Sequence, residues 1–234
     1  ISDLHATCFL LECLFLVCGL TLLYLTGITD DLIGVRYRQK FVIQILCACF
    51  FSIAELWIND LYGLLGIYAI PNWIGIPFTI LTIVFITNAI NLIDGIDGLA
   101  SGLSSVALLV FGLLFIEKGL WMYSMLAFST LGVLVPFFYY NVFGNAERAR
   151  KIFMGDTGSL TLGYILSFLA IKYSQNNPEV ISNTKGTFLI AFSTLIIPAF
   201  DVIRVVMVRL RNGKSPFEPD KNHIHHKFLA MGFT

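Results

Sequence analysis

The sequence predicts an all-α fold, a polytopic bundle of transmembrane helices. Of its 234 residues, 57% are hydrophobic and only 13% are charged, which is far from the balance of soluble domains. The mean hydropathy is +0.81, and several apolar stretches approach the roughly 20 residues that a helix needs to cross a bilayer. A transmembrane β-barrel would instead show short segments of alternating polarity. These observations favour membrane-spanning helices.

Seven apolar stretches are expected to form these helices within a single domain over residues 1–234. The links between them contain glycine, asparagine, proline and charge, as loops do. The first stretch lacks the basic beginning and the cleavage site of a signal peptide. The chain does not begin with Met, so we expect further sequence before residue 1. The stretches cover residues 6–26, 41–58, 77–93, 99–117, 120–140, 158–174 and 187–208.

The distribution of lysine and arginine predicts how the helices are oriented. Of the 15 basic residues, only Lys118, Lys172 and Lys185 lie in one set of connections, and all others lie in or beside the opposite set. Because cytoplasmic loops are enriched in Lys and Arg, we assign the richer set to the cytoplasm. It comprises the loops at about 27–40, 94–98, 141–157 and 209–234, which also hold the acidic and histidine-rich motifs described next.

Two adjacent carboxylates mark the first motif. Residues 28–40 read ITDDLIGVRYRQK, with Asp30 and Asp31 at a membrane boundary and Arg38 and Lys40 nearby. Neighbouring carboxylates repel each other and are costly to desolvate, so they need cations, a metal or water. The alternative is a solvated helix end flanked by basic residues.

Polar residues at every third position mark the second motif, NAINLIDGIDG (88–98). If the helix continues through it, Asn88, Asn91, Asp94 and Asp97 form one i, i+3 ridge, so two amides and two carboxylates point the same way. The glycines that follow would end the helix and allow a ligand close to the backbone. Polar contacts between helices are the alternative, and they suit Asn88 better than the carboxylates.

The third motif is KIFMGDTGSL (151–160), which lies just before an apolar stretch. Glycines flank Asp156 and small hydroxyl residues follow it, a pattern typical of helix N-termini that bind anions or a metal-bound phosphate. Asp156 could instead only cap the helix.

The fourth motif is SPFEPDKNHIHHKF (215–228). His223, His225 and His226 form a cationic and hydrogen-bonding cluster suited to phosphate or sugar. Zinc is the rival ligand, but the histidines are closely spaced and no cysteine accompanies them. A loop without any ligand is the remaining alternative.

Other polar residues have simpler interpretations. All five cysteines lie in apolar stretches, which suits small buried hydrophobes. Glu12 lacks an evident partner, so we expect a shifted boundary or a protein-facing polar contact. Asp201 and Arg204 are spaced for an ion pair within one helix. The net charge is zero, so no attraction to nucleic acid is expected.

Together the motifs describe a diphosphate site at a membrane surface. Carboxylate and amide oxygens suit Mg²⁺, which usually keeps waters and shares substrate phosphates. Basic residues and histidines suit the remaining phosphate charge.

These four motifs, in this order, resemble those of the polyprenyl-phosphate N-acetylhexosamine-1-phosphate transferases, glycosyltransferase family 4. The His-Ile-His-His form followed by FLAMGFT is more similar to the WecA/TagO branch than to the MraY branch. The resemblance implies a bundle of about ten or eleven helices, with further helices before and after this chain. It implies a multi-pass protein of the bacterial inner membrane with a cytoplasmic active site. It also leaves a homodimer open.

The resemblance further implies an enzyme that moves a sugar 1-phosphate from a UDP-N-acetylhexosamine to a polyprenyl phosphate, releasing UMP. GlcNAc-1-phosphate is the expected group, transferred at the start of lipid-linked cell-envelope glycan synthesis. Mg²⁺, or Mn²⁺ in its place, would bind Asn91 and Asp156, and Asp30 or Asp31 would orient or deprotonate the lipid phosphate. The expected substrate-binding residues are Asp94, Asp97, Arg38, Lys40, Asn141, Lys151, His223, His225 and His226.

Two other classes of protein remain open at this point. An ion-coupled transporter would also carry acidic groups in the membrane, but along a route to both sides. A catalytically inactive scaffold of the same fold would keep the motifs without turnover.

Overall fold

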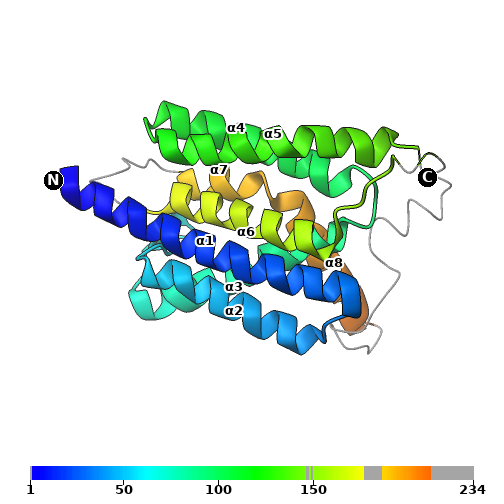
Figure 1. The fold of residues 1–234 in the computed structure, drawn as a ribbon. Coiled ribbons are helices and arrows are strands. Elements are labelled where there is room, and N and C mark those ends of the chain that lie inside the picture. The colour runs from blue at the N-terminus through cyan, green and yellow to red at the C-terminus, as the bar shows by residue number, and fades with distance from the viewer. Residues whose placement is uncertain (1, 146–147, 149, 177–185, 212–234) are drawn as a thin grey trace.

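The computed structural model describes residues 2–145, 148, 150–176 and 186–211 (Figure 1). This part of the chain is mostly helical, as predicted. Its elements are α1 (Ser2–Ile33), α2 (Tyr37–Ile53), β1 (Asp60–Leu64), β2 (Ile67–Ala69), α3 (Asn72–Ile93), α4 (Leu99–Glu117), α5 (Trp121–Phe143), α6 (Gly155–Ser174), α7 (Thr187–Ser193) and α8 (Ile196–Arg211).

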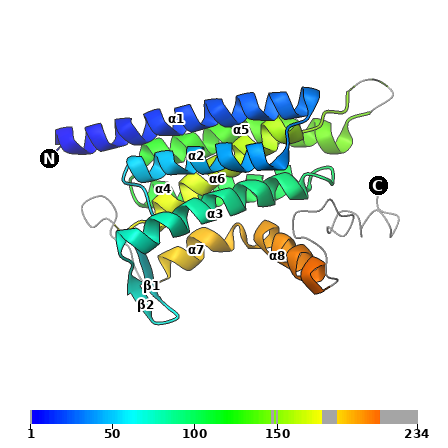
Figure 2. The same ribbon diagram turned by 90° about the horizontal axis from the view of Figure 1, so that it is seen from below.

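Helix α6 lies at the centre of the bundle. It packs against α1 on one side and α3 on another, and it also contacts α4 and α7. Seen from below, α6 lies among the other long helices, and α7 and α8 lie along α3 (Figure 2). Tyr164 and Phe168 of α6 pack against Phe51 of α2, with ring centroids 4.7 and 5.4 Å from that of Phe51. The core is therefore built around α6, whose side chains are buried over most of its length.

Fewer helices pass as membrane spans than the seven stretches predicted. Within the described residues, four helices are long and apolar enough to cross a membrane: Leu10–Ile33 of α1, α3, α4 and α5. The number is five if the bent pair formed by α7 and α8 is one span. Helix α2 has only 17 residues. Helix α6 is not among these spans and carries Asp156 and Lys172 near its two ends. Because most of α6 is buried among other helices, its surface does not have to be apolar.

The predicted helical stretch 41–58 is wrong at its C-terminal end. Helix α2 ends at Ile53, although the apolar sequence continues to Ile58. Glu55 has a φ of 57°, which breaks the helix, and the backbone N–H of Ile58 donates to the Thr79 hydroxyl of α3 at 2.9 Å. An antiparallel hairpin of β1 and β2 follows and leads into α3. Apolar content alone did not distinguish this buried turn from helix.

The predicted stretch 187–208 is also not one straight helix. A 70° bend separates α7 from α8. Pro198 stands in the first turn of α8, where its ring would clash with the carbonyl of residue 194 in a continuous helix. The bend turns α8 away from the direction of α7 (Figure 2).

Glu12 lies in a buried ion pair with Lys172, a partner that the sequence did not indicate. The Lys172 ammonium of α6 donates to Oε1 of Glu12 at 2.6 Å, and the Tyr123 hydroxyl of α5 donates to Oε2 at 2.6 Å. The protein-facing contact expected for Glu12 is thus confirmed. Glu12, Lys172 and Tyr123 together join three helices at the end of the bundle where α6 finishes.

Candidate functional site

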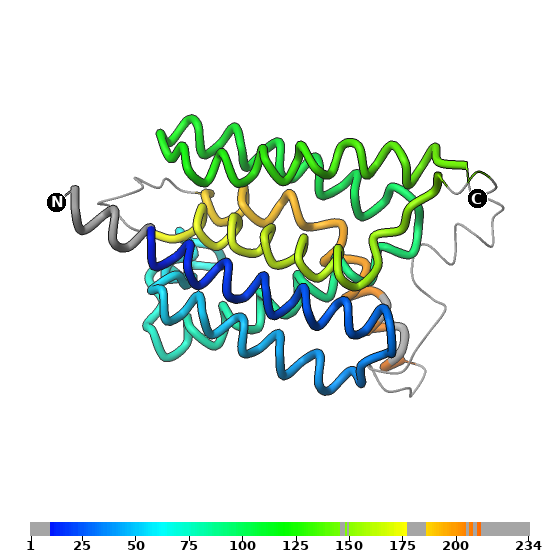
Figure 3. The backbone as a smooth tube through the Cα atoms, in the orientation of Figure 1, coloured from blue at the N-terminus to red at the C-terminus, as the bar shows by residue number. Residues whose placement is uncertain are grey.

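The polar end of the bundle is the end where α1, α3 and α5 finish and α2, α4 and α6 begin. The tube in Figure 3 shows the chain that leads into α6 coming close to the end of α1. Most of the predicted site residues that the structure describes lie at this end, on separate elements.

Asp30 and Asp31 are adjacent in α1 but contact different partners. Asp30 accepts hydrogen bonds from the Lys40 ammonium of α2 and from the backbone N–H of Val35. Asp31 accepts from the backbone N–H groups of Asp156 and Thr157 at 2.8 and 3.1 Å, and from the Thr157 hydroxyl at 2.6 Å. The two carboxylates are therefore not equivalent.

Asn91 and Asp156 come together from α3 and α6. The Asn91 amide donates to Oδ1 of Asp156 and, at 2.8 Å, to the Ser159 hydroxyl. Lys40 lies 3.2 Å from the other carboxylate oxygen of Asp156. Four helices thus place an amide, two carboxylates and one ammonium group, counting Asp30, around one point.

Helix α3 ends inside the second motif, before Asp94 and Asp97. Helix α3 ends at Ile93, Asp94 is its C-cap, and the chain turns before α4 begins. The i, i+3 ridge therefore holds for Asn88 and Asn91 but does not continue as helix to Asp97. Asp97 forms an ion pair with Lys151 instead, which joins this turn to the loop before α6.

Asp94 has an unusual protonation equilibrium. Burial, together with the nearby negative charges of Asp156, Asp97 and Asp31, raises its pKa to about 7. Among the described residues it has no salt bridge. It is therefore an acid whose charge changes near neutral pH, next to the proposed metal ligands.

Asn141 holds two loops together. Its side-chain oxygen accepts from the backbone N–H of Gly98 at 2.6 Å, and its amide donates to the carbonyl of Ile152 at 2.8 Å. Asn141 is buried, with only 4% of its surface exposed. The structure gives Asn141 a role in fixing the turn after α3 against the loop before α6.

Two further predictions concern residues beside this point. Asn88 exchanges hydrogen bonds with Gln44 of α2, so the helix-joining interpretation is confirmed. Arg38 is exposed, donates to the Tyr37 hydroxyl, and lines a groove of about 640 Å³ between α1 and α2. Since residues two apart on a helix point to different sides, Arg38 does not accompany Lys40 into the site. His223, His225 and His226 lie outside the described residues.

Thr157, Ser159 and Gln44 are polar residues of this region that the sequence did not single out. The first two belong to the small hydroxyl residues that follow Asp156 in the third motif. Their position at the start of a helix indicated a capping role, but their side chains contact Asp31 of α1 and Asn91 of α3. Gln44 carried no comparable signal.

The donor set suits a hard cation held jointly with a substrate. Within the described ranges, no three His, Cys, Asp or Glu side chains gather as a closed metal cage. Asn91 and Asp156 offer an amide and a carboxylate side by side. Mg²⁺ is commonly bound by one or two carboxylates together with substrate phosphates, so this pair fits that mode better than a protein-only site.

The fold and the site define a polytopic helical membrane protein with a partly neutralised acidic site at one end of its bundle. Residues 13–174 match the family model described as glycosyl transferase family 4. The chain belongs to this family, as its motifs predicted.

Curated relatives carry consistent names. A Yersinia pestis protein named undecaprenyl-phosphate alpha-N-acetylglucosaminyl 1-phosphate transferase is 31% identical over 223 residues, covering 94% of this chain and 59% of the relative. A Bacillus subtilis protein named probable undecaprenyl-phosphate N-acetylglucosaminyl 1-phosphate transferase is 33% identical over 225 residues, covering 92% and 58%. The chain thus spans less than two thirds of the length of these relatives.

Proposed function

We propose that this chain carries the catalytic centre of a phospho-N-acetylhexosamine transferase. The donor is a UDP-N-acetylhexosamine, with N-acetylglucosamine the expected sugar, and the acceptor is a polyprenyl phosphate such as undecaprenyl phosphate. The observation that carries the proposal is the convergence of Asn91, Asp156, Asp30 and Lys40 from four helices at the polar end. The names of the relatives support the same reaction.

The reaction is an in-line displacement at phosphorus. An oxygen of the lipid phosphate attacks the phosphorus that bears the sugar, the bond from that phosphorus to the bridging oxygen breaks, and UMP leaves with its electron pair. A phosphomonoester has a second pKa of about 6, so the attacking phosphate is already mostly dianionic at neutral pH. Positioning and charge neutralisation are therefore the main tasks of the protein. No aspartyl-phosphate intermediate is needed.

The described side chains divide these tasks. Asn91 and Asp156 would hold Mg²⁺, which when bound neutralises and aligns the diphosphate. The Lys40 ammonium group, which contacts both Asp30 and Asp156, would supply a positive charge to the phosphates. Asp30 orients the attacking lipid phosphate through that ammonium group. Asp94 and Asp97 lie on the turn after α3 and are assigned to the nucleotide side.

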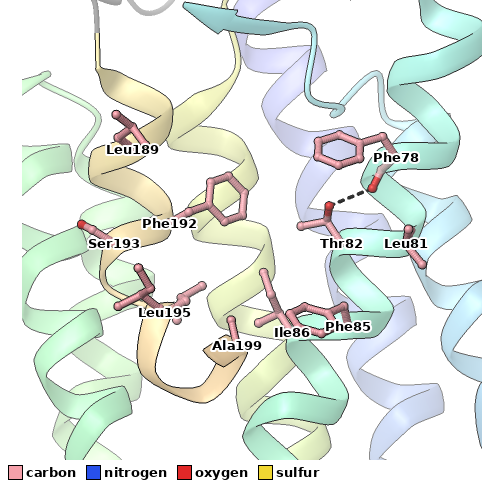
Figure 4. A pocket seen from close by; sticks show the side chains of 11 residues that line it. Phe78, Leu81, Thr82, Phe85, Ile86, Leu189, Phe192, Ser193, Leu195 and Ala199 are labelled. Atoms are coloured by element: carbon pink, nitrogen blue, oxygen red, sulfur yellow. Dashed lines mark hydrogen bonds between the residues drawn. The ribbon is translucent and has the colours of Figure 1, made fainter. Parts of the chain in front are cut away.

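An apolar groove offers a path for the polyprenyl chain. It has a volume of about 520 Å³ and lies between α3 and the bent pair of α7 and α8. In Figure 4, Phe78 and Ile86 from α3 and Phe192 from α7 point into it. Ile86 precedes Asn91 by five residues on α3, which is about 7.5 Å along the helix axis. A chain in the groove would therefore have its phosphate end at about the level of Asn91 along α3.

The site is assigned to the cytoplasmic face of the inner membrane. The polar end carries Arg36, Arg38, Lys40, Lys151 and Arg211, whereas Lys118 and Lys172 lie toward the opposite end. This asymmetry supports the orientation, because basic residues concentrate in cytoplasmic loops.

Release of UMP tests the proposal. The purified protein in lipid nanodiscs is given undecaprenyl phosphate, UDP-N-acetylglucosamine and Mg²⁺. We expect release that requires all three, and Asn91→Ala and Asp156→Ala should each reduce it at least about 100-fold. Glu117→Ala, which removes an exposed carboxylate far from the site, is the control and should leave release unchanged. Normal release by Asp156→Ala would contradict the metal assignment. A screen of several UDP-N-acetylhexosamines then identifies the sugar.

A further inference from the structure

The carboxylate of Asp31 is bound to the first turn of α6. Oδ1 accepts the backbone N–H of Asp156, and Oδ2 accepts both the N–H and the hydroxyl of Thr157, at 2.8, 3.1 and 2.6 Å. The first N–H groups of a helix have no partner within the helix, and a negative charge is favoured beside them. Asp31 therefore supplies from α1 the cap that α6 lacks locally, since Met154 at the N-cap makes no side-chain cap hydrogen bond.

Two glycines shape the space around this contact. Gly27 lies one turn before Asp31 on α1, and a Cβ atom there would overlap the Cα of Thr157. Gly155 has a φ of +64°, and a Cβ on it would lie 2.9 Å from Oδ2 of Asp31. Any other residue at either position would push α1 away from the start of α6. The close approach and the cap therefore depend on one another.

Asp31 is poorly placed to act on a substrate phosphate. An ionised carboxylate has about four lone-pair sites, and three hydrogen bonds from α6 already fill most of them. Asp30 contrasts with it, because its side-chain partner is the Lys40 ammonium, which also faces Asp156. Of the two adjacent carboxylates, therefore, only Asp30 contacts a cation that could also contact a phosphate.

We propose that Asp31 is a positioning residue that holds the first turn of α6, so that the Asp156 carboxylate stays against Asn91 and Lys40. Asp30 is the carboxylate of the pair that serves the lipid phosphate. This division of labour rests on the proposed function for the role of Asp156, whereas the capping role of Asp31 does not depend on it.

Hydrogen exchange tests the capping role without any turnover. Peptides covering residues 154–158 are followed by mass spectrometry in the nanodisc-embedded protein. We expect Asp31→Ala and Asp31→Asn to speed exchange of the amides of Asp156 and Thr157 by about fivefold, the change expected from loss of a helix cap. The matched variant Asp30→Asn should leave these amides unchanged. Asp31→Asn keeps the side-chain shape, so it serves if Asp31→Ala does not fold.

Kinetics with the same variants test what the cap is for. In Asp31→Asn we expect the half-saturating Mg²⁺ concentration to rise about fivefold, with the KM for undecaprenyl phosphate and the pH profile unchanged. In Asp30→Asn we expect kcat to fall while the Mg²⁺ requirement stays the same. Loss of turnover in Asp31→Asn with unchanged exchange and unchanged Mg²⁺ dependence would make Asp31 a catalytic residue and overturn the proposal. If even the unaltered protein transfers no sugar phosphate, the proposed function fails, and the exchange data still decide the capping role.

Discussion

Lys40 lies 3.2 Å from the Asp156 carboxylate, and the same ammonium group contacts Asp30. One cation from α2 therefore serves two carboxylates from α1 and α6. A divalent cation at Asp156 would compete with this ammonium group, so the proposed function predicts that Lys40 sets the balance between binding of metal and binding of phosphate.

Lys40→Gln should shift that balance in a measurable way. Without the ammonium group, Asp156 attracts Mg²⁺ more strongly, so we expect the half-saturating Mg²⁺ concentration to fall about threefold or more. The KM for undecaprenyl phosphate should rise, because its phosphate loses a cation. Steady-state UMP release at varied Mg²⁺ and lipid measures both, and Arg36→Gln on the exposed start of α2 is the control. A raised Mg²⁺ requirement in Lys40→Gln would count against this role.

The raised pKa of Asp94 predicts a pH-dependent stability. Its pKa is about 7 in the folded protein and close to 3.8 when unperturbed, so ionisation is disfavoured by folding. The folded state should lose stability as the pH rises from about 4 to about 7, and Asp94→Asn should remove this loss. After discounting for partial exposure, we expect the stabilisation by Asp94→Asn to be on the order of 1–2 kcal/mol larger at about pH 8 than at about pH 5. Thermal unfolding in metal-free buffer measures the difference, and an equal effect at both pH values would refute the assignment.

The buried pair of Glu12 and Lys172 predicts strong coupling between α1 and α6. Lys172→Met leaves a carboxylate buried without its cation and should destabilise the protein by about 3–5 kcal/mol. Glu12→Gln with Lys172→Met should recover much of this loss, because the glutamine oxygen can still accept from Tyr123. A double-mutant cycle on thermal unfolding measures the coupling. Additive effects would show that the two charges do not depend on each other.

Gly27 predicts a steric limit on the contact of α1 with α6. Gly27→Ala places a methyl group on the backbone of Thr157, so both thermal stability and UMP release should fall. Gly132→Ala on α5 is the matched control, because a Cβ there meets no atom within 4 Å. It should be neutral or stabilise by up to about 1 kcal/mol, the gain in helix propensity. Equal losses of stability and of UMP release in both variants would show that these properties do not depend on the close approach of α1 and α6 at Gly27.

The arrangement of the motifs could be predicted from the sequence because it follows from simple geometry. Alternate connections of a helical bundle meet at one end, so Asp30, Asp94 and Asp156 had to lie at the same end. Stretch 99–117 coincides with α4, and the Asp201–Arg204 ion pair is confirmed, since both depend on local spacing alone.

The partners of individual side chains could not be predicted in this way. Asp30 and Asp31 point about 100° apart on α1, and which of them meets α2 or α6 depends on how the three helices pack. Glu12 meets Lys172 across 160 positions of sequence, and no local pattern links them. The end of α2 at Ile53 was missed because a buried turn is as apolar as a helix.

The central place of α6 has a consequence for how the protein enters the membrane. Asp156 and Lys172 lie near the ends of α6, and serine and threonine lie between them. This composition makes insertion of α6 into lipid by itself unfavourable. Its charges find their partners on α1 and α2, which are synthesised long before it. We therefore expect α6 to insert together with α1 and α2 rather than as an independent segment. Glu12 would be costly to expose to the hydrocarbon core until Lys172 reaches it.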